Sequence, residues 1–291
     1  MKKIILLGAA GQLGLLVARS APNNVVLDCF SHEELDITNY GAVKELILKR
    51  SPDIVINTAA YTAVDNAEEQ HQLAFEINAQ AVENIAITTP PETRIIHVST
   101  DFVFSKASEY PYKPDDPIAP ESVYGQSKAA GEKTILQHHP DNAIILRTSW
   151  LYSAQGNNFV TTMLGLMAEK DELSIVSDQF GSPTSAHLLA EVIWKFALDC
   201  QADGIFHWSD RGIITWYDFA VDIYTQARKL GILNKDVIMK AITTKDYPTP
   251  ASRPCYSALD SAATEDILGI KTSPWREELF KVLEKIKGCS N

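Results

Sequence analysis

The stretch "KKIILLGAAGQLG" (residues 2–14) decides the fold, because an apolar run of strand length ends in three glycines spaced three residues apart. Gly8 permits a tight turn, Gly11 lets the backbone approach a pyrophosphate, and Gly14 lets the following helix lie close to the sheet. The N-terminus of that helix presents free N–H groups to phosphates. The strand–turn–helix context predicts a dinucleotide-binding unit, although the same glycines could form a plain tight turn in a packed α/β unit.

Apolar runs of strand length alternate with helical patterns through the first half of the chain. A long helix is predicted over 68–87. Strands are predicted at 2–8, 25–29, 53–59, 94–100 and 142–149, and they are almost continuously apolar. Such strands are typical of a parallel sheet that helices cover on both faces. We therefore predict an α/β fold built on a doubly wound, Rossmann-like parallel sheet.

After Trp150 the alternation becomes less regular. Helices are predicted over 158–170, 186–199, 216–231 and 275–287, with short strands at 173–178 and 204–210. We predict an NAD(P)-binding domain over 1–150 and a smaller substrate-binding lobe over 151–291. The lobe is expected to be partly interleaved with the main sheet, with some segments returning to it.

Composition narrows the class of protein. The chain has 291 residues, a net charge of −11, and hydrophobic and charged fractions typical of a soluble globular protein. No apolar run approaches the roughly 18–20 residues of a membrane helix. The acidic balance argues against nucleic-acid binding, which needs basic patches. The four cysteines are scattered and form no CxxC or Cys/His cluster, so we expect no metal site and a cytoplasmic location.

Two acidic residues could meet the adenosine half of a dinucleotide. Asp28 lies near the end of the second strand, where a carboxylate can accept hydrogen bonds from ribose hydroxyls. Alternatively, Asp28 is simply a solvent-exposed residue at the end of the strand. Asp36 could lie beside the adenine, or it could simply cap the following helix.

The segment "VYGQSKAAGE" (123–132) places Tyr124 and Lys128 on one face of a predicted helix, four residues apart. A carbonyl reduced by hydride needs a proton at its oxygen, and an ammonium beside a tyrosine favours the phenolate. Thr100 ends the fourth predicted strand, at the sheet edge where ligands bind. The YxxxK spacing alone is common by chance. Together with the glycine loop it predicts Tyr124 as proton donor, Lys128 as its partner and Thr100 as the residue that holds the carbonyl oxygen.

Further motifs carry a resemblance to a known family. They are "NTAAYTAVDNAE" (57–68), "STDFVF" (99–104), "RTSWLY" (147–152), "GNNFV" (156–160), "DQFGSPT" (178–184), "TWYDFA" (215–220) and "YPTPASRP" (247–254). With the two motifs above, the chain resembles the extended short-chain dehydrogenase/reductases and, within them, the dTDP-4-dehydrorhamnose reductase family. The likeness runs almost from end to end.

The resemblance implies reduction of the C4 keto group of dTDP-4-dehydro-L-rhamnose to dTDP-L-rhamnose, with NADPH or NADH as the cofactor. It implies the catalytic set Thr100, Tyr124 and Lys128. It implies substrate contacts from Thr100, Asp101 and Trp150. Besides Gly8, Gly14, Tyr124 and Lys128, the cofactor contacts are expected from Gly11, Gln12, Leu13, Asp28, Asp36, Ile37, Ala60, Tyr61 and Thr62. Mg²⁺ and a homodimer are compatible with the family, but no motif here requires either.

Some residues depart from the family pattern or have two interpretations. Phe102 stands where the family usually has Tyr, and Ser105 and Lys106 stand in a loop where a Gly is common. Arg253 could bind a diphosphate through its planar guanidinium, or it could form a structural salt bridge. His97, and also His207 with Trp208, are predicted to be core residues, and His138 and His139 to be surface residues.

Other functions compete with this interpretation. One is reduction of another nucleotide-linked 4-keto-6-deoxysugar. Another is an epimerase or dehydratase with tightly held NAD. A third is a non-catalytic regulatory subunit, like that of methionine adenosyltransferase, which has the same fold. The intact Thr–Tyr–Lys set weakens the third.

Overall fold

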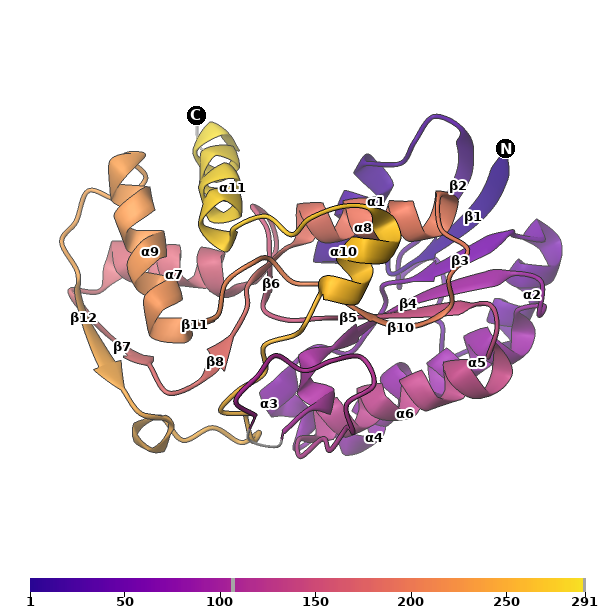
Figure 1. Ribbon diagram of the computed structural model, residues 1–291, viewed down its shortest axis with the longest axis horizontal. Coiled ribbons are helices and arrows are strands. Elements are labelled where there is room, and N and C mark those ends of the chain that lie inside the picture. The colour runs from indigo at the N-terminus through magenta and orange to yellow at the C-terminus, as the bar shows by residue number, and fades with distance from the viewer. Residues whose placement is uncertain (106–107, 290–291) are drawn as a thin grey trace.

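The computed structural model describes residues 1–105 and 108–289, and its larger part is built on one parallel sheet (Figure 1). The six strands lie in the order β10-β5-β4-β3-β1-β2, and every pairing between neighbours is parallel. Their bounds are β1 (Lys2–Leu7), β2 (Val25–Phe30), β3 (Ile54–Asn57), β4 (Arg94–Thr100), β5 (Ala143–Thr148) and β10 (Gly204–His207). The predicted doubly wound parallel sheet is confirmed.

Helices cover both faces of this sheet, which explains why its central strands are mostly apolar. On one face lie α1 (Gln12–Arg19) and α8 (Ala186–Leu198), whose apolar side chains share a core with β1 and β3. On the other face lie α2 (Tyr40–Arg50), α5 (Ala81–Thr88) and α6 (Val123–His138). Figure 1 shows α8 above the sheet and α5 and α6 below it. β3 and β5 are buried along their whole length as a result.

The long helix that the sequence suggests around residues 68–87 is broken into shorter segments. They are α3 (Val64–Ala67), α4 (His71–Phe75), the π-helical turn η1 (Glu76–Gln80) and α5. The π turn packs closely against α6, since a Cβ on Gly131 would lie 2.2 Å from the carbonyl oxygen of Asn78. A π turn inside a helix re-aims the side chains around it and often accompanies a functional site.

The second part of the chain forms a smaller lobe with its own apolar core. It contains α7 (Phe159–Glu169), β7 (Glu172–Val176), α9 (Trp216–Lys229), β12 (Ile238–Ile242) and α11 (Trp275–Cys289). Two short strand pairs complete it: β6 (Leu151–Tyr152) with β9 (Thr184–Ser185), and β8 (Phe180–Gly181) with β11 (Ile214–Thr215). β12 pairs with β7 in parallel, and this pairing was not predicted from the sequence.

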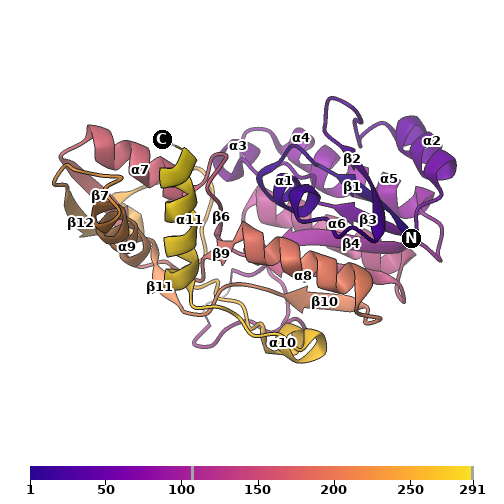
Figure 2. The ribbon, with the colours of Figure 1, turned by 90° about the horizontal axis from the view of Figure 1, so that it is seen from above.

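Three segments that follow residue 151 lie with the main sheet, as Figure 2 also shows. Strand β10 forms its edge beside β5, α8 packs against α1, and α10 (Ala262–Leu268) packs against β10. The chain therefore crosses between the two parts several times. The division at residues 150 and 151 stays a prediction.

The histidines outside the motifs are mostly where the sequence suggested. His97 and His207 are fully buried and Trp208 is 2% exposed, so these core predictions are confirmed. His138 is exposed, but the prediction for His139 was wrong. The side chain of His139 is buried against α5, where its Nε2 lies 2.9 Å from the carbonyl oxygen of Ala86.

Candidate active site

The glycine loop between β1 and α1 is shaped by close backbone contacts. Gly8 has a left-handed φ of +77°, and a Cβ there would lie 2.5 Å from the backbone nitrogen of Ala59. A Cβ on Gly14 would lie 2.2 Å from the carbonyl oxygen of Gly8. Gly11 precedes the first turn of α1 and closes the loop with an N–H donated to Gly8. The free N–H groups of that turn, together with this cradle, suit a pyrophosphate.

A cavity of about 540 Å³ lies on one side of this loop. Besides Gly8 and Gly11, its lining includes His32, Asp36, Ile37, Ala60 and Glu76. The Asp36 carboxylate accepts hydrogen bonds from the hydroxyl and the N–H of Thr38, and these bonds lower its pKa. Asp28 does not line this cavity. Its carboxylate lies 3.3 Å from the Nε of Arg50, on α2.

A second cavity of about 420 Å³ lies on the other side of the loop, at the carboxyl ends of β4 and β5. It brings together Thr100, Asp101, Tyr124, Lys128 and Trp150, which are all the residues predicted to act on a substrate except Arg253. Of the predicted cofactor contacts, its lining includes Gly11, Gln12, Leu13, Ala60 and Thr62. The two cavities share Gly11, Thr58 and Ala60, so one elongated ligand could occupy both.

Thr100 and Tyr124 both line this second cavity, although they come from different elements. Thr100 is the last residue of β4, and Tyr124 lies in the first turn of α6, which Ser122 caps. The ring of Phe102 packs edge-on against Tyr124, with centroids 5.5 Å apart. Burial raises the pKa of Tyr124 to about 12. The sequence predicted a lowered pKa. In this structure burial dominates, and the phenol keeps its proton.

Lys128 lies one helical turn after Tyr124 and is buried. Its Nζ donates a hydrogen bond of 2.7 Å to the carbonyl oxygen of Val98 and lies 3.4 Å from Nε2 of His97. Burial lowers the pKa of Lys128 to about 8, and Glu132 partly opposes this shift. Burial and the lysine hold the pKa of His97 well below its usual value, so the imidazole is neutral. The contact between His97 and Lys128 was not foreseen.

Trp150 and Asp101 form other parts of the cavity lining. Trp150 has a left-handed φ of +45°, and its indole stacks on Trp216 with centroids 3.5 Å apart. A Cβ on Gly181 would lie 2.6 Å from the Trp150 ring, so the glycine is what makes room for it. Asp101 is buried, and burial raises its pKa to about 6 although its carboxylate accepts a hydrogen bond of 3.1 Å from the Thr100 hydroxyl.

Asn78 is a positioning residue that the sequence reasoning missed. It lies in the π turn, accepts from the N–H of Tyr61 and donates to the carbonyl oxygen of Tyr61 and to the hydroxyl of Ser127. It therefore ties the loop of residues 60–62 to the helix that carries Tyr124. The phenol of Tyr61 donates to Gln70 and is not among the cavity-lining groups. A buried asparagine inside an apolar helical pattern is the signal that could have revealed this role.

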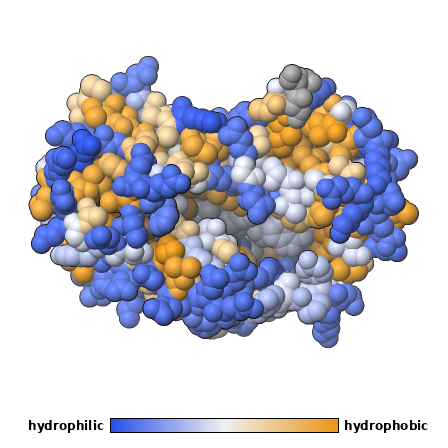
Figure 3. All heavy atoms as spheres, turned by 180° about the vertical axis from the view of Figure 1, so that it is seen from behind, coloured by the Kyte–Doolittle hydropathy of each residue, from blue (hydrophilic) through white to orange (hydrophobic). Residues whose placement is uncertain are grey.

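A third cavity of about 480 Å³ lies in the smaller lobe. Its lining includes Lys170, Trp216, Tyr247 and Arg253. The guanidinium of Arg253 forms a bidentate pair with Asp65, with distances of 3.0 and 2.7 Å. The salt-bridge interpretation of Arg253 therefore describes this structure, and the guanidinium also borders a cavity. Figure 3 shows one face of the molecule hollowed between its two ends.

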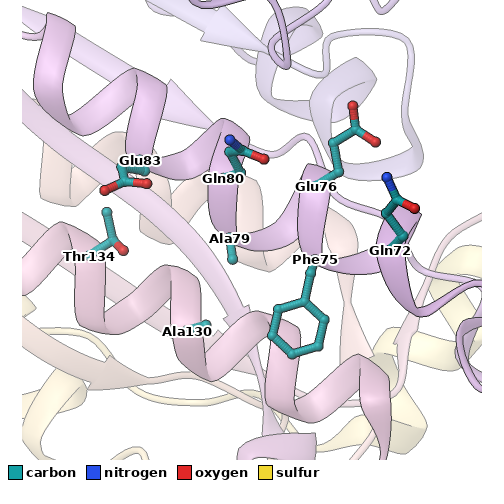
Figure 4. A pocket seen from close by; sticks show the side chains of 8 residues that line it. All are labelled: Gln72, Phe75, Glu76, Ala79, Gln80, Glu83, Ala130 and Thr134. Atoms are coloured by element: carbon teal, nitrogen blue, oxygen red, sulfur yellow. The ribbon is translucent and has the colours of Figure 1, made fainter.

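Another groove of about 430 Å³ lies on the outer side of α4, η1, α5 and α6. In Figure 4 the Phe75 ring points toward α6, whereas the Glu76 carboxylate points away from the ring. None of the predicted site residues lines this groove.

Within residues 1–105 and 108–289, no three His, Cys, Asp or Glu side chains are grouped so as to hold a metal ion. None of the helices in these residues is long and apolar enough to cross a membrane. Ser105 lies at the edge of the described part, whereas Lys106 lies outside it.

Comparisons with known proteins agree with this geometry. The family model described as "RmlD substrate binding domain" matches residues 1–287. A dTDP-4-dehydrorhamnose reductase of Salmonella typhimurium is 41% identical, over 97% of each chain. The crystal structure of a dTDP-4-dehydrorhamnose reductase from Clostridium acetobutylicum superposes with a TM-score of 0.91 at 38% identity, over 98% of this chain and 99% of that one.

A second solved structure, a dTDP-4-dehydrorhamnose reductase from Bacillus anthracis, was determined in complex with NADP. It has a TM-score of 0.91 and 34% identity, and the match covers 98% of this chain and 99% of that one. Both the family model and these relatives span nearly the whole sequence. The chain therefore belongs to the RmlD substrate binding domain family, that of the dTDP-4-dehydrorhamnose reductases.

Proposed function

We propose that this chain reduces the C4 keto group of dTDP-4-dehydro-L-rhamnose to give dTDP-L-rhamnose, with NADPH or NADH as reductant. One observation supports this most directly. Thr100, Tyr124 and Lys128 line one cavity that adjoins the glycine loop, and Trp150 offers an apolar face in the same cavity. A 6-deoxysugar has an apolar methyl group and ring face that can pack on an indole.

The residues around the glycine loop suit a nicotinamide dinucleotide, which would supply the hydride when bound. In this proposal Gly8, Gly11 and Gly14 admit the pyrophosphate to the N-terminus of α1. Gln12, Leu13, Ala60 and Thr62 would surround the nicotinamide half, and Asp36 and Ile37 the adenosine half. The phenol of Tyr61 would have to leave Gln70 to contact the cofactor. Asp28 would reach a ribose hydroxyl only if its contact with Arg50 opened.

Proton transfer is assigned to Tyr124. The phenol is protonated at neutral pH and lines the same cavity as Thr100, so a carbonyl oxygen bound there can meet both side chains. Thr100 then holds this oxygen while Tyr124 donates its proton to it. Lys128 would hold the cofactor ribose, for which its ammonium would have to leave the carbonyl oxygen of Val98. Beside the phenolate that remains, its ammonium stabilises the negative charge.

The dinucleotide is assigned to the main sheet and the nucleotide part of the substrate to the smaller lobe. This assignment follows the predicted division into an NAD(P)-binding domain over 1–150 and a substrate-binding lobe over 151–291. The stacked pair Trp150 and Trp216 places the catalytic cavity beside the cavity of the smaller lobe. Arg253 borders that second cavity, where its guanidinium could meet a diphosphate. Asp101 is assigned to the sugar hydroxyls.

The test follows cofactor absorbance at 340 nm with purified protein and a panel of dTDP- and UDP-linked 4-keto sugars. Oxidation of NADPH or NADH with dTDP-4-dehydro-L-rhamnose, and slower oxidation with the others, is the expected result. Tight NADPH binding without oxidation by any sugar would favour a regulatory subunit. Turnover without added reductant would favour an epimerase or dehydratase.

A further inference from the structure

A buried ion pair lies directly behind the proposed catalytic cavity. Arg147, in β5, binds Glu132, in α6, through two hydrogen bonds of 2.9 and 2.7 Å. Both side chains are nearly inaccessible, with exposures of 2% and 3%. The hydroxyl of Ser99 donates to the same carboxylate at 2.5 Å. This pair therefore joins α6, β4 and β5.

The pair is next to the catalytic set in the sequence as well as in space. Ser99 precedes Thr100, and Glu132 follows Lys128 by one helical turn. Residues four apart lie on the same helical face. The Glu132 carboxylate therefore connects the end of β4 to the helix that carries Lys128.

Each nitrogen of the Arg147 guanidinium has an acceptor. Beyond Glu132, its Nη1 donates to the carbonyl oxygen of Pro114 and lies 3.3 Å from Nε2 of His207. Nδ1 of His207 lies 2.9 Å from the carbonyl oxygen of Tyr112, so this nitrogen carries the proton and Nε2 is free to accept. The Arg147 guanidinium also lies over the ring of Phe104. A network this complete holds the arginine in one orientation.

A buried ion pair often contributes less to stability than apolar residues of similar volume would. Removing two charges from water costs free energy, and apolar side chains do not have this cost. We propose that Glu132 and Arg147 are a positioning pair, which fixes Thr100 and α6 relative to each other, with Glu132 as the counter-charge of the Lys128 ammonium. This inference rests on the proposed function only for the role of Lys128 in binding the cofactor. Glu132 opposes the effect of burial on Lys128, which is the direction that the proposal requires.

The test uses cofactor binding, which needs no sugar substrate. NADPH affinity is measured by fluorescence from pH 6 to 10 in wild type and in Glu132→Gln. The groups around Lys128 are His97 of β4, Tyr124 and Glu132 of α6, Asp101 after β4, and Arg147 of β5 beyond Glu132. Only Glu132 changes its charge in the variant. Without it, Lys128 loses its proton at lower pH, so the alkaline loss of affinity should begin at least about half a pH unit earlier.

Three further variants separate positioning from general stability. Glu132→Gln/Arg147→Gln removes both charges and leaves no lone buried cation. It should shift the profile in the same direction, though by less because the Arg147 cation is also gone, even if the single variant folds poorly. Glu132→Asp keeps the charge and should restore the wild-type profile. Glu278→Gln removes another buried helical carboxylate, paired with Lys281 at 2.6 Å, and should lower the melting temperature without moving the profile.

The outcomes are distinct. A shifted profile in the single or double variant, with the wild-type profile in Glu132→Asp and Glu278→Gln, supports the positioning pair. An unchanged profile in a folded Glu132→Gln or double variant overturns it and leaves the pair a structural one. Failure of the proposed function appears separately, as wild-type protein that binds NADPH but reduces no 4-keto sugar.

Discussion

Trp150 and Trp216 stack with ring centroids 3.5 Å apart and planes inclined by only 11°. Trp150 lines the catalytic cavity and Trp216 lines the cavity of the smaller lobe, so the pair is a wall shared by both. Trp150 adopts a left-handed backbone conformation that is costly for a tryptophan. Stacking on Trp216 helps to hold it there.

Replacing Trp216 should therefore weaken sugar binding rather than cofactor binding. In Trp216→Ala the Trp150 ring loses the partner that fixes its plane, and KM for the nucleotide sugar should rise roughly 5- to 20-fold. The NADPH dissociation constant should stay within about twofold, because the glycine loop is untouched. Trp216→Phe keeps a stacking ring and should fall between the two. Steady-state kinetics and fluorescence titration check this, and an unchanged KM in Trp216→Ala would count against it.

The phenol of Tyr124 is the group on which the proposed mechanism depends most. Tyr124→Phe should lower kcat by about 10²- to 10⁴-fold, because the carbonyl oxygen loses its proton donor. NADPH binding should change little. Tyr152→Phe is a matched control, since it removes another buried tyrosine hydroxyl outside the catalytic cavity. It should affect the melting temperature but not kcat. Full activity in Tyr124→Phe would refute the mechanism.

The contact between Gly14 and Gly8 makes a sharp prediction for cofactor binding. A Cβ at position 14 would lie 2.2 Å from the carbonyl oxygen of Gly8, so Gly14→Ala must push α1 away from the loop. NADPH affinity should fall at least about tenfold and the melting temperature should drop. Gly165→Ala is the control, because its Cβ would meet nothing within 4 Å and alanine favours the middle of α7. It should bind NADPH normally and unfold at a slightly higher temperature.

The features predicted successfully from the sequence are those encoded by local spacing. The glycine loop could be placed because a strand, three glycines and a helix follow one another within 19 residues. Tyr124 and Lys128 could be placed on one helical face by their separation of four. Thr100 could be placed at the sheet edge because parallel strands present their carboxyl ends together.

The features that escaped prediction depend on contacts between distant segments. The helix around residue 78 was expected to be continuous, but α6 crosses it at Gly131 and the turn there is π-helical. The neighbour of Lys128 on β4, His97, becomes visible only when the strand and the helix are packed. Asp28 lies near the end of β2 as predicted, yet its side chain lies beside Arg50. No local pattern encodes which side of a strand end a carboxylate will face.

Asp210 gives a prediction for stability as a function of pH. It is 2% exposed, accepts from the N–H of Ser185, and burial raises its pKa to about 8. The folded chain therefore holds a proton that the unfolded chain releases above about pH 4. Stability contributed by this group is greatest at low pH and is lost as the pH rises toward 8. Asp210→Asn should raise the free energy of unfolding at pH 8 by about 1–3 kcal/mol and much less at pH 5. Denaturant titrations at the two pH values check this, and equal effects at both would contradict it.

The guanidinium of Arg253 could act as a structural salt bridge to Asp65, as a contact for the substrate diphosphate, or as both. Variants of the two residues distinguish these roles. If the guanidinium only bridges the two segments, Arg253→Gln and Asp65→Asn should both lower the melting temperature and leave KM for the dTDP-sugar unchanged. If it also binds the diphosphate, Arg253→Gln should raise that KM by about 10- to 100-fold, because a charge-assisted bond to phosphate is lost. Asp65→Asn should then leave KM the same or lower, since it frees the guanidinium.

Arg253 also lowers the pKa of Asp65, so the stability due to this pair is present at neutral pH and lost as the pH falls through that lowered pKa. Measuring KM for both variants at pH 7.5, with melting curves at pH 7.5 and at acid pH, distinguishes the roles. An equal rise of KM in both variants would mean that the pair acts by shaping the lobe, and that Arg253 does not bind the substrate.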